Sequence, residues 1–175
     1  MTDLSVIILT KNEKLHIWRC LERIAPLEPR QIFVVDCFST DGTQSIVESF
    51  AAELATNHCS LTTSHNPLYT SISVVGHEWP GLYAKQFNWA LDNLPVKASW
   101  VLRLDADEYL YPNAIEELKA MLPKWDGEEV MAGCLPQDVT SLSLSLARVF
   151  CGRQIRFGGT AHIPMVRFFK YGIGR

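Results

Sequence analysis

Three largely apolar runs constrain this chain most, because each is short, rich in β-branched residues and followed by polar residues. The runs are Leu4–Leu9, Gln31–Asp36 and Trp100–Leu104. Runs of this kind are typical of strands that are buried on both faces, as in parallel sheets. The polar clusters at their ends are Thr10–Glu13, Asp36–Thr43 and Asp105–Glu108.

Apolar residues with helical spacing follow the first two runs and precede the third. The residues expected on the inner faces are Leu15, Trp18, Leu21 and Ile24, then Ile46, Val47, Phe50, Ala51 and Leu54, then Tyr83, Phe87, Ala90 and Leu94 in a helix over 81–93. Alternating strands and helices predict an α/β fold with parallel strands. The carboxyl ends of such strands share one edge of the sheet, so the three polar clusters should meet there.

The remainder of the chain gives weaker signals. Pro112 fits the first turn of a further helix. After Pro123 the pattern favours strands without clear helices between them. The weaker strand predictions are Cys59–Thr63, Ile72–Val75, Val130–Leu135, Leu142–Phe150 and Met165–Phe169.

Length and composition exclude several classes of protein. The 175 residues correspond to one domain, and 16 Lys and Arg against 19 Asp and Glu give a net charge of −3, which disfavours nucleic acid as a partner. No apolar run approaches the roughly 20 residues of a membrane span, and no signal peptide is visible. Five cysteines without a C-x-x-C pair indicate free thiols in a reducing compartment, so we expect a cytoplasmic location.

The Asp105-Ala106-Asp107 segment is the main candidate for chemistry. Residues i and i+2 of an extended chain point the same way, so two carboxylates would face one spot. Two adjacent negative charges are costly without a cation between them, and Mg²⁺ or Mn²⁺ prefers such oxygen ligands and often bridges to phosphates. This segment therefore predicts a metal–diphosphate site, with a solvated surface turn as the alternative.

Two further clusters have both a binding and a structural interpretation. Asp36 ends a buried strand, so it could accept hydrogen bonds from a base or ribose, or it could cap the following turn. Thr10, Asn12 and Glu13 could bind a ligand at the end of the first strand, or they could cap the next helix.

Taken together, these segments resemble a family 2 nucleotide-sugar glycosyltransferase. The stretches that carry the resemblance are Ser5–Glu13, Val34–Thr43, Leu102–Glu108, Trp79–Gly81 and Gln86–Leu91. A later region is similar to the branch that builds lipopolysaccharide cores and surface polysaccharides, through Arg153–Arg156, Gly158-Gly159 and Val166–Phe169. The resemblance covers nearly the whole chain.

The resemblance implies a GT-A fold, a mixed and mainly parallel sheet flanked by helices. It also implies inverting transfer of a sugar from a nucleoside diphosphate, UDP by default, to a bacterial surface glycan or lipid-linked acceptor at the inner face of the membrane. Asp107 would bind Mn²⁺ or Mg²⁺, and Asp105 would hold the ribose or a metal-bound water. The other residues expected in the nucleotide-sugar site are Thr10, Asn12, Glu13, Asp36, Gln86 and Asn88.

The chain departs from the family pattern in two places. Cys37 stands where many relatives have a second Asp, which weakens uridine as the default base. An inverting transferase also needs a general base, which we expect beyond Arg175, so no catalytic residue is named. We therefore expect one domain over 1–175 that is cut short at its acceptor side, with a nucleotide-binding half over 1–110 and the start of an acceptor-side half over 111–175.

Other functions stay open at this point. A non-catalytic nucleotide-sugar-binding module, or an inactive fragment of a longer transferase, would equally lack the base. A sugar nucleotidyltransferase would need a Gly-rich phosphate loop where Thr10–Glu13 stands. A dehalogenase-like phosphatase would carry its D-x-D segment near the N-terminus, unlike Asp105–Asp107.

Overall fold

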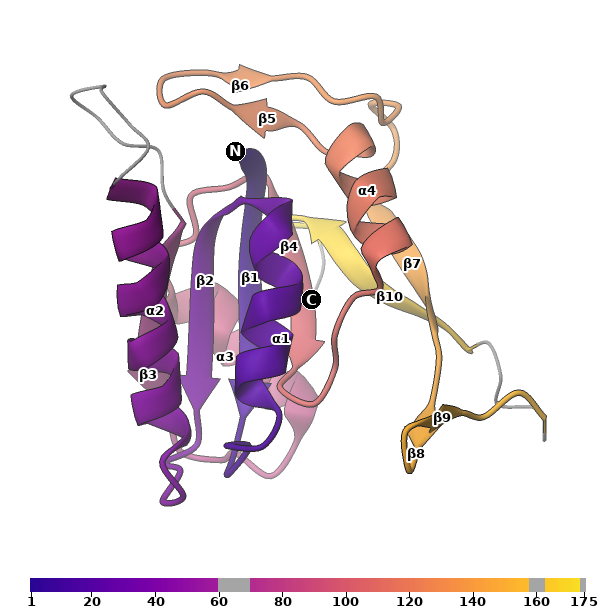
Figure 1. Cartoon of the computed structure of the whole chain (residues 1–175). Helices are drawn as coiled ribbons and strands as arrows, with labels where there is room; N and C mark the ends of the chain where they lie inside the picture. The colour runs from indigo at the N-terminus through magenta and orange to yellow at the C-terminus, as the bar shows by residue number, and fades with distance from the viewer. Residues whose placement is uncertain (60–69, 158–162, 174–175) are drawn as a thin grey trace.

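The computed structural model describes residues 1–59, 70–157 and 163–173 (Figure 1). Its main sheet has the order β3-β2-β1-β4-β10-β7, in which β1 to β4 are parallel and β10 is antiparallel to both of its neighbours, β4 and β7. The strand bounds are β1 Thr2–Thr10, β2 Pro29–Asp36, β3 Ser71–Gly76, β4 Trp100–Asp105, β7 Ser141–Leu146 and β10 Ile163–Lys170. The predicted mixed, mainly parallel α/β sheet is therefore confirmed.

Helices cover both faces of this sheet, as Figure 1 shows. Their bounds are α1 Ile17–Ile24, α2 Thr43–Cys59, α3 Tyr83–Asn93 and α4 Pro112–Met121, with a short 3-10 turn at Ala25–Leu27. The shorter strands are β5 Lys124–Trp125, β6 Val130–Met131, β8 Val149–Phe150 and β9 Arg153–Gln154. Within the described ranges no helix is both long and apolar enough to cross a membrane.

Alternate residues of β1 lie in two separate cores. Val6 and Ile8 pack with α1, α2 and α4, whereas Ile7 and Leu9 pack with α3, and all four side chains are buried. This two-sided burial explains why β1 is apolar at nearly every position rather than at alternate positions.

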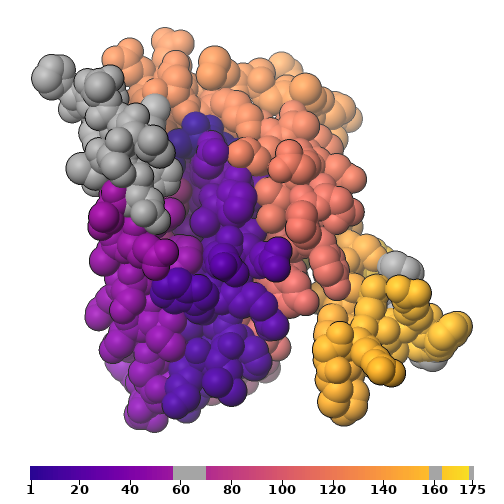
Figure 2. Space-filling view, in the orientation of Figure 1, coloured from indigo at the N-terminus to yellow at the C-terminus, as the bar shows by residue number. Residues whose placement is uncertain are grey.

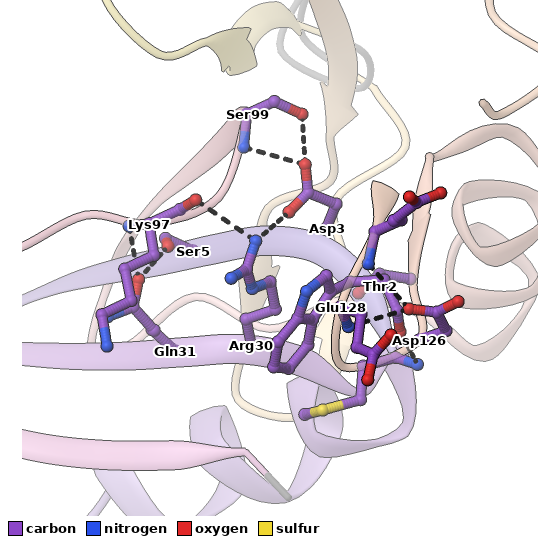
Figure 3. Close-up of polar contacts among 12 residues, drawn as sticks. Thr2, Asp3, Ser5, Arg30, Gln31, Lys97, Ser99, Asp126 and Glu128 are labelled. Carbon is purple, nitrogen blue, oxygen red and sulfur yellow. Dashed lines mark hydrogen bonds and ion pairs between the residues drawn. The ribbon is translucent and has the colours of Figure 1, made fainter. Parts of the chain in front are cut away.

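A buried polar network fixes the amino ends of the central strands (Figure 3). Asp3, 1% exposed, accepts hydrogen bonds from Arg30 Nη1 at 2.8 Å and from the Ser99 backbone N–H at 3.0 Å. Gln31 Oε1 accepts hydrogen bonds from Ser5 Oγ at 2.9 Å and from the Lys97 N–H at 2.7 Å. These bonds join β1, β2 and the segment that precedes β4 at the amino ends of the strands.

The structure corrects several details of the sequence predictions. Leu15 is 82% exposed because α1 begins only at Ile17, and Tyr83 is 61% exposed instead of facing inward because it is the first residue of α3. The strand predicted over 130–135 is confined to β6, and the one predicted over 142–150 is divided into β7 and β8. Cys59 ends α2, and the rest of the strand predicted to begin there lies outside the described residues.

Candidate functional site

The carboxyl ends of β1, β2 and β4 meet at one edge of the sheet. Thr10 lies opposite Asp36 in the β1–β2 register, and Leu9 lies opposite Asp105 in the β1–β4 register. A cavity of about 430 Å³, which we call the strand-end cavity, opens at this edge. The convergence of the three polar clusters is therefore confirmed. The cavity is lined by Leu9, Thr10, Lys11, Glu13, Cys37, Trp79, Tyr83, Gln86 and Asp105–Asp107.

Asn12 joins the loops that follow β1 and β2. Its φ of +55° is a conformation that Asn tolerates better than most residues. Its backbone N–H donates to Ser39 Oγ at 2.7 Å, and its Oδ1 accepts from the Thr40 N–H at 2.9 Å. Lys11 Nζ donates to the Phe38 carbonyl at 3.1 Å, which is a further hydrogen bond between the same two loops. Asn12 thus shapes the cavity wall, and its side chain does not line the cavity.

Asp36 is fully buried, and both of its carboxylate oxygens have partners inside the protein. Oδ2 accepts from the Ser39 N–H at 2.8 Å and from Gln44 Nε2 at 2.6 Å, and Oδ1 accepts from Ser39 Oγ at 2.5 Å. Of the two interpretations of Asp36, these bonds support the turn cap, which orders the loop after β2.

Thr10 and Glu13 reach the cavity directly. Thr10 is 4% exposed, and its hydroxyl has no hydrogen-bond partner among the described residues. A buried hydroxyl without a partner is costly, and a ligand at this wall could supply one. Glu13 Oε2 lies 2.7 Å from His16 Nδ1, which orients the carboxylate at the cavity rim.

Gln86 lies on α3, lines the strand-end cavity and is fully buried. Its Oε1 lies 2.7 Å from His77 Nδ1, and its Nε2 donates to Cys37 Sγ at 3.3 Å. His77 stacks on Trp89 with ring centroids 3.7 Å apart, and burial raises the pKa of the Cys37 thiol. Asn88, on the same helix, lines neither this cavity nor the second one described below.

Sequence reasoning missed two residues that line this cavity, Trp79 and Tyr83, and one that contacts its lining, His77. His77 directly follows the end of β3, the fourth parallel strand, and its position after Ile72–Val75 was the signal that could have identified it. Trp79 and Tyr83 form an aromatic pair at the rim, with centroids 4.8 Å apart. Both rings are exposed, at 43% and 61%, so they present aromatic surface to a ligand.

Asp105 lies between two guanidinium groups. Its Oδ1 is 3.4 Å from Arg103 Nη2, and its Oδ2 is 3.7 Å from Arg167 Nη2 on β10. Arg167 also pairs with Glu108, whose other carboxylate oxygen accepts from the Asp105 N–H at 3.0 Å. Burial raises the pKa of Glu108. Arg103 on β4 and Arg167 on β10 thus hold the turn after β4 from both sides.

A second and larger cavity, of about 1040 Å³, lies on the other side of this turn. Asp105 and Asp107 line both cavities. Other residues around the second cavity include Tyr109, Tyr111, Ser143, Arg148, Phe150 and Arg167. Two compartments therefore share one pair of carboxylates.

Asp107 is the carboxylate best placed to hold a cation. It is exposed and lines both cavities, and no side-chain partner for it is found in the described part of the chain. No cluster of three or more His, Cys, Asp or Glu side chains that could hold a metal occurs among the described residues. Mg²⁺-type sites use one or two carboxylates completed by water and substrate phosphate, so Asp107 and Asp105 fit a cation shared with a diphosphate.

Several solved structures resemble this chain. The mannosyltransferase PcManGT from Pyrobaculum calidifontis, solved with GDP-Man and Mn²⁺, is 26% identical over 84% of this chain and 36% of its own, with a TM-score of 0.53.

Two further structures resemble the chain less closely. Mannosyl-3-phosphoglycerate synthase from Rubrobacter xylanophilus is 20% identical over 63% of this chain and 32% of its own, with a TM-score of 0.39. HddC from Yersinia pseudotuberculosis is 12% identical over 98% of this chain and 75% of its own, with a TM-score of 0.43. The chain thus spans about a third of the length of the first two proteins.

A search of curated proteins gives no match. The family model described as glycosyl transferase family 2 matches residues 5–134, which is more than half of the chain and includes most of β1, all of β2 to β4 and the three polar strand-end clusters. The sheet order and the likeness to PcManGT agree with a GT-A fold. The chain therefore belongs to glycosyltransferase family 2.

Proposed function

We propose that this chain binds a nucleoside diphosphate sugar in the strand-end cavity and transfers the sugar to a glycan acceptor in the second cavity. The observation that carries this proposal is the position of Asp107, whose carboxylate lines both cavities. A group at that point can contact a donor on one side and an acceptor on the other. We infer transfer with inversion at the anomeric carbon, as the resemblance implies.

The walls of the strand-end cavity suit a nucleotide. Trp79 and Tyr83 present aromatic faces on which a base can stack, at a rim that also holds Glu13. The unpartnered Thr10 hydroxyl can bond to a ribose or phosphate oxygen. Gln86 keeps the floor in place through His77 and Cys37, so we assign it a positioning role. Asn88 is the expected donor residue with the weakest support, because it lies away from both cavities.

Asp107 and Asp105 would hold a divalent cation. When bound there, a cation neutralises charge on the leaving diphosphate without a proton transfer. Arg103 and Arg167 keep the Asp105 carboxylate in place from both sides. Arg167 and Glu108 hold the backbone of the same turn, which carries Asp107, so the turn is in place before the donor arrives.

Two candidate nucleotides remain. Uridine diphosphate is the prediction from the family resemblance, and Cys37 weakens it because many relatives carry an Asp there. Guanosine diphosphate is the alternative, because PcManGT was solved with GDP-Man and Mn²⁺. The Cys37 thiol lies in the cavity wall, where it can affect this choice directly.

We infer that the acceptor is a bacterial surface or lipopolysaccharide-type glycan, carried on a lipid at the inner face of the membrane. Tyr109, Tyr111 and Phe150 can stack on sugar rings, and Arg148 can contact phosphate groups of such an acceptor. We propose residues 1–110 as the nucleotide half and 111–175 as the start of the acceptor half.

Donor turnover tests the proposal. The chain is incubated with GDP-mannose or with UDP-sugars, with Mn²⁺ or with a chelator, and the released nucleoside diphosphate is measured. We expect release from one donor class only, dependent on the cation and absent in Asp107→Asn. Binding without release in the presence of acceptor glycans would favour the non-catalytic module, which the family match does not favour.

A further inference from the structure

Charge is distributed unevenly along this chain. Residues 139–175 contain six Lys and Arg and no Asp or Glu, a formal charge of +6. Residues 1–138 contain the other ten Lys and Arg and all 19 acidic residues, a formal charge of −9. Such asymmetry indicates that the basic part meets an anionic partner that the acidic part does not.

Half of the six basic residues lie in one short hairpin, Arg148–Phe157. Its strands β8 and β9 pair Val149 with Gln154 and Phe150 with Arg153, and the Ile155 N–H donates to the Arg148 carbonyl at 2.8 Å. The hairpin forms a small sheet of its own. It lies at the tip of the arm that extends from β7 and β10 (Figure 1), and the space-filling view shows this orange to yellow segment standing apart from the indigo and magenta body (Figure 2).

The hairpin exposes bulky apolar side chains beside its arginines. Phe157 is 87% exposed, Phe150 72%, Val149 45% and Ile155 37%. The arginines Arg148, Arg153 and Arg156 are exposed as well, and no ion pair involves them in the part of the chain that the structure describes. Exposed aromatic and aliphatic side chains next to unpaired arginines are unusual on a surface that faces only water.

This combination fits an anionic lipid surface. Aromatic and aliphatic side chains enter the boundary between headgroups and acyl chains, while neighbouring arginines bind lipid phosphates. A single-stranded nucleic acid fits less well, because it needs a continuous basic groove, whereas the body beside the hairpin is acidic. The exposed apolar side chains beside the arginines therefore favour the membrane.

We propose that the hairpin Arg148–Phe157 docks this chain on a bilayer that contains anionic phospholipids, through Phe150 and Phe157 together with Arg148, Arg153 and Arg156. Arg148 and Phe150 also line the second cavity, so docking would bring the mouth of that cavity, and with it Asp107, to the lipid surface. The inference deepens the proposed function, because it rests on an acceptor carried by a membrane lipid.

Vesicle flotation tests the inference without donor or metal, so its outcome is distinguishable from failure of the donor proposal. The chain is mixed with vesicles of phosphatidylcholine alone, or of phosphatidylcholine and phosphatidylglycerol in equal amounts. We expect flotation only with the anionic vesicles. The triple variant R148Q/R153Q/R156Q should lose about tenfold or more in vesicle affinity, and F150S/F157S should also lose affinity.

The control R23Q/K85Q/K97Q removes three exposed positive charges from other parts of the surface and should bind like the unaltered chain. All variants change exposed side chains, and matching circular dichroism melts would confirm that they fold. The inference is overturned if the unaltered chain fails to float with anionic vesicles, or if the hairpin variant floats as well as the control. Binding of a single-stranded RNA through these arginines in place of vesicles would also overturn it.

Discussion

Arg167 on β10 forms an ion pair with Glu108, which lies 59 residues earlier in the chain at the turn after β4. Both side chains are largely buried, at 6% and 17% exposure. Glu108 in turn accepts a hydrogen bond from the Asp105 N–H, so Arg167 supports the turn that carries Asp105 and Asp107. Arg167 lies beyond the segment that the family model matches, so this support comes from the C-terminal part of the chain.

Removing Arg167 should destabilise the protein, because it leaves the Glu108 carboxylate buried without its cation. Breaking a buried ion pair in this way costs about 3–5 kcal/mol, so Arg167→Met should lower the free energy of unfolding by an amount of that order. The double variant with Glu108→Gln should show a coupling energy of about 0.5–3 kcal/mol in urea unfolding. Additive effects of the two substitutions would mean that the pair is not formed.

The buried Asp3–Arg30 ion pair should contribute more to the free energy of unfolding than an ion pair on the surface. Asp3 is 1% exposed and holds both Arg30 and Ser99, so Asp3→Ala should cost roughly 3–5 kcal/mol of unfolding free energy. The matched control is Lys119→Ala, which removes an ion pair with Glu28, a residue that is 53% exposed, and should cost about 1 kcal/mol or less. Equal losses in the two variants would contradict the structural role assigned to the network.

Gln86 and Asn88 both lie on α3, but only Gln86 lines the strand-end cavity. Substituting each of them therefore tests whether the nucleotide binds in this cavity. Gln86→Leu removes the bonds to His77 and Cys37 at the cavity floor, so nucleoside diphosphate affinity should fall up to about tenfold, the equivalent of one hydrogen bond. Asn88→Leu should leave affinity unchanged, because Asn88 lines neither cavity. Titration calorimetry measures both, and a larger effect of Asn88 would place the donor elsewhere.

Asp41 predicts a pH dependence of stability. The hydrogen bond from the Thr43 hydroxyl, with further bonds from the Lys14 and Thr43 N–H groups, lowers the pKa of Asp41 below its usual 3.8. A lowered pKa means that the folded state binds the proton less tightly than the unfolded state, so this stabilisation is complete above pH 3.8 and is lost as the pH falls through the folded-state value.

Asp41→Asn should therefore be less stable than the unaltered chain at neutral pH, and the difference should shrink below pH 3.8. Thermal melts across this range measure the effect. The exposed Glu22→Gln serves as a control that should show no such convergence. A constant difference between Asp41→Asn and the unaltered chain at all pH values would mean that these hydrogen bonds do not lower the pKa of Asp41.

The central sheet could be predicted from the sequence because its strands are buried on both faces. The run Leu4–Leu9, which is apolar except at Ser5, is typical of a strand buried on both faces, and polar residues at three such ends meet once the strands are parallel neighbours. Tyr83 was predicted wrongly because helical spacing alone does not show where a helix begins, and Tyr83 is the exposed first residue of α3.

Other features depend on contacts between distant segments. An Asp at the end of a buried strand can cap the following turn or bind a ligand, and the sequence around Asp36 is the same in both cases. The hydrogen bonds from Ser39 and Gln44 to Asp36 distinguish the two roles. The pairing of Arg167 with Glu108 depends on the β10–β4 register, which the local sequence does not determine. Asp105 and Asp107 could be identified as candidate site residues because they follow a buried strand. Arg103 and Arg167, which contact Asp105, could not be identified from the sequence.

Thermal melting with UDP, GDP, CDP and TDP, each with and without Mn²⁺, tests the central claim most directly when repeated in Asp107→Asn and in the exposed control Asp138→Asn. A nucleotide at ~100 times its dissociation constant should add about 2.7 kcal/mol, which is about 5–10 °C in Tm for a chain of this size. We predict a Mn²⁺-dependent rise for one nucleotide that Asp138→Asn keeps and Asp107→Asn loses. A rise that is independent of Mn²⁺, or one that Asp107→Asn retains, would contradict the assignment of Asp107 as the residue that joins cation and donor.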